Sequence, residues 1–262
     1  MVQDDAGVRS IERAVAILRE IAAAPLEGCR LSDLAEATGL GKGTTHRLMQ
    51  TLVRVGFACQ DGAGGRYYLG YELARLGQAQ GRYDIAEHAR PALLRIARET
   101  GDTVFISVRE GHDAICLDRQ IGDYPIKTLT LNIGDRRPLG VGAGSLMLLA
   151  ALSDAQATAV IAANVGKLET YPRYSPEILR KLVQRTRADG YAYNDGRVLR
   201  AMSAVAVPVK DATGSVIAAL SVASIAQRMT KKRISMIVKL LEHEAAQLRH
   251  VPVSVRQQGE SV

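Results

Sequence analysis

Residues 31–69, LSDLAEATGLGKGTTHRLMQTLVRVGFACQDGAGGRYYL, constrain the fold of this chain more than any other stretch. Apolar residues recur at helical spacing on both sides of the turn Gly39-Leu40-Gly41, whose glycines tolerate a sharp reversal of the backbone. The second helix ends at Gly56, and alternating residues then predict a β-hairpin with its tip at residues 61–65. Two short helices followed by a hairpin are typical of a winged helix-turn-helix. We therefore interpret this stretch as a DNA-binding head.

The second helix of the pair is expected to contact DNA. We expect Ser32 to cap the first helix, and Leu48, Leu52 and Val55 to bury one side of the second. The side chains left for the outer surface and the hairpin are of the types that bond base edges and phosphates in the major groove. These candidate DNA-binding residues are Lys42, Thr44, Thr45, His46, Arg47, Gln50, Thr51, Arg54 and Arg66.

The local charge supports this interpretation better than the charge of the whole chain does. A helical core domain with a solvated polar face would show a similar helical pattern, but with mixed charges. From the glycine turn to the end of the hairpin the cations are Lys42, Arg47, Arg54 and Arg66, whereas Asp61 is the single acid. The formal net charge of +7 adds little, because most of the excess lies in the second half of the chain.

Length and composition exclude several classes of protein. The 262 residues fit two ordinary domains, and no run approaches the roughly 20 apolar residues of a membrane span. The N-terminus, MVQDDAGVRS, lacks the apolar segment of a signal peptide. Cys29, Cys59 and Cys116 are scattered and form no CxxC pair, which fits a reducing compartment. We expect a cytoplasmic protein with no cofactor, no metal site and no membrane partner.

Two further helices are predicted beside the head. Ser10 is expected to cap a first helix that ends near Pro25 and packs behind the helix-turn-helix pair. Residues 71–80 predict a linker helix to the rest of the chain. The inward positions of the first helix are expected to be Ile11, Val15, Leu18 and Ile21.

The part of the chain after the linker, from residue 85, predicts an α+β domain with a mostly antiparallel sheet flanked by helices. Apolar residues at helical spacing alternate with strand-like runs separated by glycine and aspartate turns. The expected helices cover residues 85–100, the segment after the glycines at 140–144, 176–189 and 231–249, and the expected strands cover residues 103–109, 114–119, 127–131, 202–210 and 215–224.

The glycine segment at residues 140–144 is the main candidate for a binding site in this region. Its spacing and the strand order do not fit a dinucleotide fold. It is either an anion site at a helix N-terminus or a tight turn before a packed helix. Ser221, in an apolar strand, and Asn194, in an expected turn, could reach a cavity. His112 and His243 have no catalytic partner in a recognisable arrangement, so enzyme activity has little support.

Taken together, residues 9–250 resemble the IclR family of bacterial transcriptional regulators. The resemblance implies a winged helix-turn-helix over residues 9–70, a linker helix over 71–84, an effector-binding domain similar to GAF folds over 85–250, and a polar tail over 251–262. It also implies a homodimer, often a dimer of dimers, that binds palindromic promoter DNA. The segments that carry it are Gly41 to Leu52 (GKGTTHRLMQTL), Val55-Gly56-Phe57, Arg137-Pro138-Leu139, Gly190-Tyr191, Ala206-Val207-Pro208-Val209 and Ala218 to Ser224.

The resemblance further implies a small organic or aromatic acid effector, bound between the sheet and the helix after the glycine segment. The resemblance implies that relatives which bind a small oxoacid carry an acid, a cysteine and a second serine at these positions. This chain has Asn194, Ala204 and Ala223 there instead. This less polar pocket predicts a bulkier or partly aromatic ligand. Arg197 or Arg200 could pair with the ligand carboxylate or lie on the surface. The implied effector-binding residues are Leu139, Gly140, Val141, Gly142 and Ala143 on one side, and Asn194, Ala204, Ser221 and Ala223 on the other.

The sequence thus predicts a ligand-controlled DNA-binding regulator of transcription, with a repressor as the default interpretation. Two other classes compete with it. One is a small-molecule-binding or hydrolytic enzyme with an accessory helical domain. The other is a structural protein that coats DNA without sequence preference.

Overall fold

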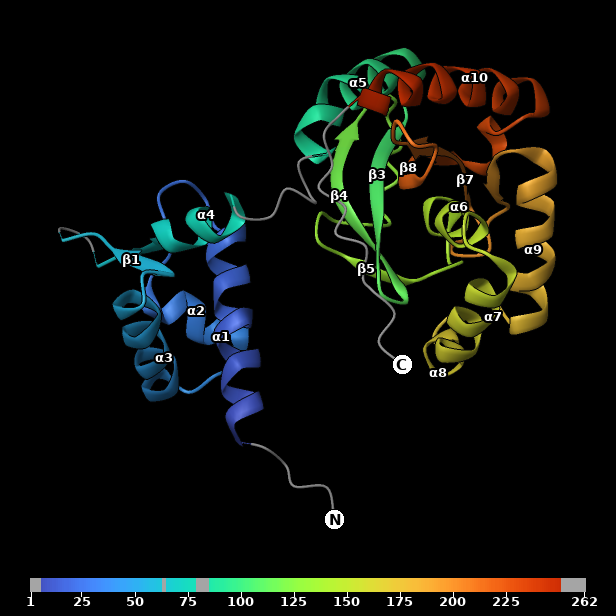
Figure 1. Ribbon diagram of the computed structural model, residues 1–262. Coiled ribbons are helices and arrows are strands. Elements are labelled where there is room, and N and C mark those ends of the chain that lie inside the picture. Colours follow the sequence, from blue (N-terminus) through green and yellow to red (C-terminus); the bar gives the residue numbers. More distant parts are fainter. Residues whose placement is uncertain (1–5, 63–64, 79–84, 251–262) are drawn as a thin grey trace. The chain divides into compact units, whose positions relative to one another are not determined.

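The computed structural model describes residues 6–62, 65–78 and 85–250 (Figure 1). The chain divides into two compact units, Met1–Gln80 and Gly81–Val262. The end of the predicted linker, residues 79–84, and the predicted polar tail, residues 251–262, lie outside the described residues.

The first unit has the predicted order of helices and hairpin strands. A two-stranded antiparallel sheet pairs Ala58 with Leu69 and Gln60 with Tyr67. The chain between the first two helices adds a single bridge, Cys29 to Tyr67, along the same edge. The unit is therefore a winged helix-turn-helix. Its elements are α1 (Ala6–Ala23), α2 (Leu31–Thr38), α3 (Lys42–Arg54), β1 (Ala58–Gln60), β2 (Tyr67–Leu69) and α4 (Tyr71–Gln78).

The small core of the first unit differs in part from the prediction. Met49 is fully buried beside Leu52, whereas Val55 is 48% exposed because α3 ends at Arg54 and Val55 serves as its C-cap. In α1 the buried positions are Ile17 and Ile21, and the predicted positions Ile11 and Val15 are exposed. Leu48 and Leu18 are partly buried against this core.

Two predicted helix caps were also wrong. Helix α1 begins at Ala6, so Ser10 lies inside it, and Ser32 lies in the first turn of α2. The start of α2 is instead held by Asp33, whose Oδ2 accepts a hydrogen bond from the backbone N–H of Arg30 at 3.0 Å. The glycine turn is confirmed, since Gly39 ends α2 with a φ of +64°, a conformation that favours glycine.

The second unit contains a six-stranded sheet whose described strand pairs are all antiparallel, in the order β5-β4-β3-β8-β7-β6. The predicted strand at residues 127–131 does not form. That segment is irregular, and its Thr128 is buried where its backbone N–H meets the Thr103 hydroxyl. Two short edge strands, β5 and β6, were missed by the prediction. The strands are β3 (Thr103–Glu110), β4 (Asp113–Ile121), β5 (Arg136–Pro138), β6 (Ala192–Asn194), β7 (Met202–Lys210) and β8 (Val216–Ile225).

Helices cover both faces of this sheet (Figure 1). Helices α5 (Ile85–Thr100) and α10 (Lys231–Gln247) pack on one face, against large side chains such as Ile106, Val207 and Leu220. The other face carries alanines, including Ala206 and Ala219, and packs against α6 (Ala143–Ala150). Small side chains on this face let α6 lie close to the sheet, and all eight of its residues are buried.

The helices beyond α6 complete that second layer. Helix α9 (Pro176–Asp189) has its predicted bounds, because Ser175 Oγ accepts from the N–H of Ile178 and Gly190 ends the helix at a φ of +77°. Helices α7 (Asp154–Ala163) and α8 (Val165–Leu168) were not predicted. Within the described part of the chain, no helix is long and apolar enough to cross a membrane.

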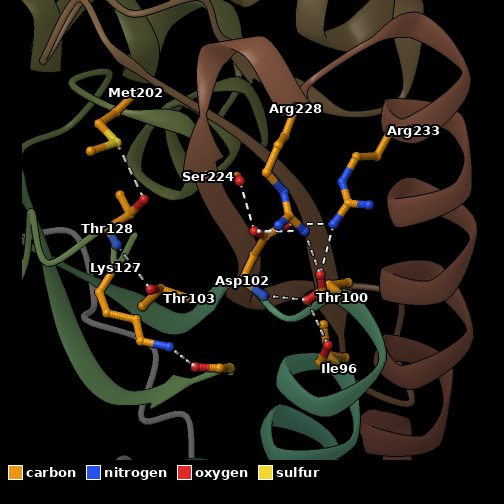
Figure 2. A network of polar contacts seen from close by, with 11 residues as sticks. Ile96, Thr100, Asp102, Thr103, Lys127, Thr128, Met202, Ser224, Arg228 and Arg233 are labelled. Atoms are coloured by element: carbon orange, nitrogen blue, oxygen red, sulfur yellow. Dashed lines mark hydrogen bonds and ion pairs between the residues drawn. The ribbon is translucent and has the colours of Figure 1, made fainter. Parts of the chain in front are cut away.

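A buried carboxylate near the start of β3 joins the sheet to helices α5 and α10 (Figure 2). Asp102 accepts from Ser224 Oγ at 2.7 Å and from Arg233 Nη2 at 2.8 Å, and Arg228 Nη2 lies 3.3 Å away. Both arginines also donate to the carbonyl of Thr100, which is the last residue of α5. The network therefore ties α5, the start of α10 and strand β8 together.

Candidate functional site

The outer face of α3 carries most of the candidate DNA-binding residues. The side chains of Lys42, His46, Arg47 and Gln50 are exposed, as are those of Thr51 and Arg54, and Thr44 is partly exposed. Since α3 is the second helix of the helix-turn-helix, this face has the position and the chemistry of a recognition helix.

Thr45 does not belong to this face. Its side chain is fully buried, and Oγ1 donates to the carbonyl of Gly41 at 3.3 Å. The reason is helical spacing, since Thr45 lies one turn before Met49 on the side that packs against the core. The prediction of Thr45 as a DNA contact was therefore wrong.

Arg66 is partly committed within the protein. Its Nη1 donates to the carbonyl of Gly28 at 2.9 Å, and its backbone N–H donates to Asp61 Oδ1 at 2.9 Å. The first bond fastens the wing to the segment after α1, and the second closes the hairpin. A phosphate contact from Arg66 stays a prediction.

In the second unit a cavity lies between the sheet and the start of α6. Its empty volume is about 610 Å³, including the part open to solvent. The lining residues come from all six strands of the sheet, from the irregular segment before β5, from the start of α6 and from the stretch after β6. The lining residues are Phe105, Ser107, Ala114, Cys116, Thr128, Thr130, Leu131, Arg137, Val141, Gly142, Ala143, Gly144, Ser145, Asn194, Val198, Leu199, Met202, Ser203, Ala204, Ser221 and Ala223.

Seven of the nine predicted effector residues line this cavity. They are Val141, Gly142, Ala143, Asn194, Ala204, Ser221 and Ala223. The other two, Leu139 and Gly140, are buried in the core between α6 and α9, where a side chain at Gly140 would place Cβ 2.6 Å from a methyl carbon of Leu179. They support the wall from behind and do not line it.

The glycine segment is held by hydrogen bonds of its own. Gly142, at a φ of +89°, donates its N–H to Tyr174 Oη at 3.1 Å. The N–H of Gly140 donates to Ser145 Oγ at 3.0 Å, and that hydroxyl donates to the carbonyl of Pro138. The backbone conformation leaves the first N–H groups of α6, from Ala143 and Gly144, without an acceptor in the described part of the chain. The tight turn before a packed helix is therefore observed, and an anion site at these free donors stays a prediction.

The segment before β5 forms one side of the cavity and is fastened at several points. Thr128 Oγ1 donates to Met202 Sδ at 3.3 Å, and the backbone N–H of Thr128 donates to Thr103 Oγ1 (Figure 2). Arg119 Nη1 donates to the carbonyl of Leu131 at 2.8 Å. Arg137 donates through Nη2 to the carbonyl of Thr130.

Arg137 is a lining residue that the sequence does not point to. It was noted only as part of a motif, yet its guanidinium lines the cavity, where burial lowers its pKa. The other ionisable lining group is the Cys116 thiol, whose pKa burial raises to about 12, so it is neutral at pH 7. Pairing of Arg137 with Ala114 of β4 sets its direction, and this register is not visible in the sequence.

The two arginines proposed earlier as carboxylate partners do not line the cavity. Arg197 forms an ion pair with Asp195 at 3.0 Å, and its backbone N–H donates to Asn194 Oδ1. Arg200 is exposed. The surface alternative therefore fits Arg200, whereas Arg197 is partly buried and paired outside the cavity. The described residues contain no group of three His, Cys, Asp or Glu that could hold a metal ion.

Comparison with known families places this geometry in context. The family described as bacterial transcriptional regulator IclR, C-terminal, matches residues 77–250, and the IclR helix-turn-helix domain matches residues 10–62. The chain belongs to the IclR family.

Among relatives in this family, the transcriptional regulator XynR of Escherichia coli K12 is 29% identical over 229 residues, which cover 85% of this chain and 88% of XynR. The glycerol operon regulatory protein of Streptomyces coelicolor is 28% identical over 228 residues, covering 86% of this chain and 88% of that protein. The relatives are named as regulators, and none of these comparisons favours an enzyme. The chain is a DNA-binding transcriptional regulator of the IclR family.

Solved IclR structures share both units. The IclR of Thermotoga maritima matches with a TM-score of 0.71 at 23% identity, covering 92% of this chain and 98% of that chain. The IclR regulator of Alicyclobacillus acidocaldarius matches with a TM-score of 0.69 at 26% identity, covering 92% and 97%. An IclR homologue of Microbacterium hydrocarbonoxydans, complexed with 4-hydroxybenzoate, matches with a TM-score of 0.70 at 23% identity and the same coverage. The predicted α+β fold with a GAF-like antiparallel sheet is confirmed.

Proposed function

We propose that this regulator binds palindromic promoter DNA as a homodimer or a dimer of dimers, and that a small organic or aromatic acid in the second unit changes its affinity for DNA. The observation that carries the proposal is the cavity at the start of α6, present in a chain that also has a helix-turn-helix. A DNA-binding head alone would not require a second unit with a cavity.

The DNA side of the proposal rests on the exposed face of α3. Two copies of such a face, related by two-fold symmetry, contact two half-sites, so operator and protein symmetry correspond. The domain boundaries belong to the proposal as well: a DNA-binding domain over residues 9–70, a linker over 71–84 and an effector domain over 85–250. We infer that the protein works in the cytoplasm, where promoter DNA is found.

The effector side rests on the composition of the cavity wall. Free N–H groups at the start of α6 favour an anion, while Phe105, Ala204 and Ala223 offer apolar surface. The homologue complexed with 4-hydroxybenzoate shows that an aromatic acid is a ligand of a protein with this fold. An acid with an aromatic or similarly bulky body therefore fits this chain better than a very small oxoacid does.

Regulation requires that effector and DNA prefer different arrangements of the paired heads, because a ligand shifts an equilibrium only by its differential affinity. We propose α4 and the residues after it as the transmitting element. We propose that the protein represses transcription and that the effector relieves this repression.

The test is a gel-shift titration with the DNA upstream of the gene itself, repeated with a panel of organic and aromatic acids. Arg47→Ala should weaken specific binding about 5- to 150-fold, since a base or phosphate contact contributes about 1–3 kcal/mol. The matched control is Arg19→Ala, which removes an exposed cation of α1 and should change affinity little. Unchanged operator affinity of Arg47→Ala at physiological salt would show that α3 is not the recognition helix.

The same titration tests the cavity. Ser221→Ala should reduce the response to the effective acid while sparing DNA binding, because Ser221 lines the cavity of the second unit. Ser215→Ala, in the exposed turn before β8, is the control. Equal loss of effector response and DNA binding in Ser221→Ala would instead indicate a folding role.

A further inference from the structure

The cavity carries one unbalanced charge. Of its lining side chains, all described in the structure, Arg137 alone is charged at neutral pH. Its one hydrogen bond within the described residues goes from Nη2 to the carbonyl of Thr130, and it forms no ion pair there. Asp135 acts on Arg137 only at longer range, since its Oδ2 is engaged by the N–H of Asn132 at 2.7 Å. A partly buried cation with only a carbonyl partner is costly to desolvate.

The guanidinium is placed where a ligand would meet it. Arg137 Nη1 lies 3.3 Å from the position that a Cβ at Gly142 would take, so the missing side chain keeps this side of the cation open. The next arginine along β5, Arg136, does not line the cavity and forms an ion pair with Glu110. Alternation along the strand therefore separates a paired surface arginine from an unpaired cavity arginine.

The other polar groups of the cavity are neutral. Ser107 and Ser221 lie beside Gly144, where their Oγ atoms would be 3.7 and 3.5 Å from an added Cβ. The Oγ atoms of both serines lack a hydrogen-bond partner among the described residues, so they can bond a neutral substituent or share an anion with Arg137. They add no second positive charge. One cation and neutral hydroxyls match a ligand with one negative charge better than a dianion or a cation.

We propose that Arg137 is the specificity-determining residue of the effector cavity and selects ligands with a single carboxylate. The inference rests on the proposed function, because it concerns the same cavity. The planar guanidinium can bond both oxygens of a carboxylate and supplies the charge that a neutral analogue would not use. The apolar wall accommodates the remainder of the ligand.

The experiment measures ligand binding to the full-length protein by isothermal titration calorimetry. Three probes of similar shape are compared: benzoate with one carboxylate, benzamide with none and terephthalate with two. The expected result is that the wild type binds benzoate at least 10-fold more tightly than either of the others. Arg137→Gln should weaken benzoate binding about 10- to 100-fold and leave benzamide binding nearly unchanged.

Arg136→Gln is the matched control, because it removes the neighbouring charge on the same strand and should keep the preference for benzoate. Arg137→Lys retains the charge without the fork of donors, and should keep part of that preference. The melting temperature of each unliganded variant is measured first. If Arg137→Gln does not fold, the comparison of three probes on the wild type and on Arg137→Lys still decides the question.

The outcomes separate the two hypotheses. If Arg137→Gln keeps the wild-type preference for benzoate, the assignment of Arg137 is wrong, while an acid effector in this cavity stands. If the wild type prefers benzamide or terephthalate, the single-charge argument is wrong. If neither the wild-type protein nor its operator complex responds to any carboxylate, in this series or in the wider acid panel, the proposed effector function fails and the assignment of Arg137 with it.

Discussion

Replacing Asp102 by alanine should destabilise the second unit more than removal of any exposed acid would. The Asp102 side chain is 1% exposed and holds Ser224, Arg228 and Arg233. The hydrogen bond from Ser224 and the two ion pairs with the arginines would all be lost. Breaking a buried ion pair by removing one partner costs about 3–5 kcal/mol. The two arginine side chains are 20% and 25% exposed and keep the Thr100 carbonyl as a partner, so the lower end, about 3 kcal/mol, is expected.

That loss corresponds to a decrease of roughly 6–12 °C in the melting temperature of a unit of this size. The measurement is urea and thermal unfolding followed by circular dichroism, since the chain contains no tryptophan for fluorescence. Protein concentration is held constant, because self-association shifts apparent stability.

Asp189→Ala is the matched control, since Asp189 pairs with Arg185 at 3.2 Å on the exposed surface of α9 and should cost less than about 0.5 kcal/mol. A cost below about 1 kcal/mol for Asp102→Ala would refute the reasoning, because the buried carboxylate would then contribute no more than an exposed one. Asp102 also joins strands β3 and β8, which carry Ser107 and Ser221, so the variant should respond more weakly to the effector at temperatures where it is still folded.

Two further predictions concern the wing and the cavity thiol. Gly70→Ala should disrupt the wing and lower the stability and DNA affinity of the first unit, because the added Cβ would lie 2.1 Å from the carbonyl oxygen of Gly56. The control is Gly77→Ala, whose added Cβ has no neighbouring atom within 4 Å. It should leave the melting temperature unchanged or raise it. Equal effects of the two substitutions would contradict this. Burial raises the pKa of Cys116 from 9.0 to about 12, so its thiolate should be scarce below about pH 11. Iodoacetamide should therefore label the exposed Cys59 and not Cys116 when the native protein is treated at pH 8 and analysed by mass spectrometry. Rapid labelling of Cys116 at pH 8 would contradict this and show that the thiol is accessible. The same pKa shift means that the Cys116 contribution to the free energy of unfolding is fully present below pH 9 and declines as the pH rises from about 9 to about 12. Cys116→Ala, which has no thiol to titrate, is the reference for this measurement.

Long, strongly periodic elements could be predicted from the sequence. Helices α5 and α9 have the bounds expected from their apolar spacing, their caps and the glycines that follow them. Strands β7 and β8 were predicted to within one residue at each end, because each is an apolar run with a turn between them. Such elements are set by interactions between residues near one another in the chain.

Short elements and the direction of single side chains could not be predicted in the same way. The three-residue strand β5 exists because β4 pairs with it. Residues 127–131, KTLTL, alternate as a strand would and do not form one. Thr45 looks like a surface hydroxyl in the sequence, and only packing against the core of the first unit shows that it is buried.

The sequence by itself determined the family, the winged head, the polar face of α3 and seven of the residues that line the cavity. The tertiary structure alone decided that Arg137, rather than Arg197 or Arg200, presents its charge to that cavity. The physical reason is that the direction of Arg137 depends on its register with Ala114, and its lack of an ion-pair partner depends on groups that are remote in sequence. Local patterns record which residues can form a helix or a strand, whereas an unpaired charge is a property of everything packed around it.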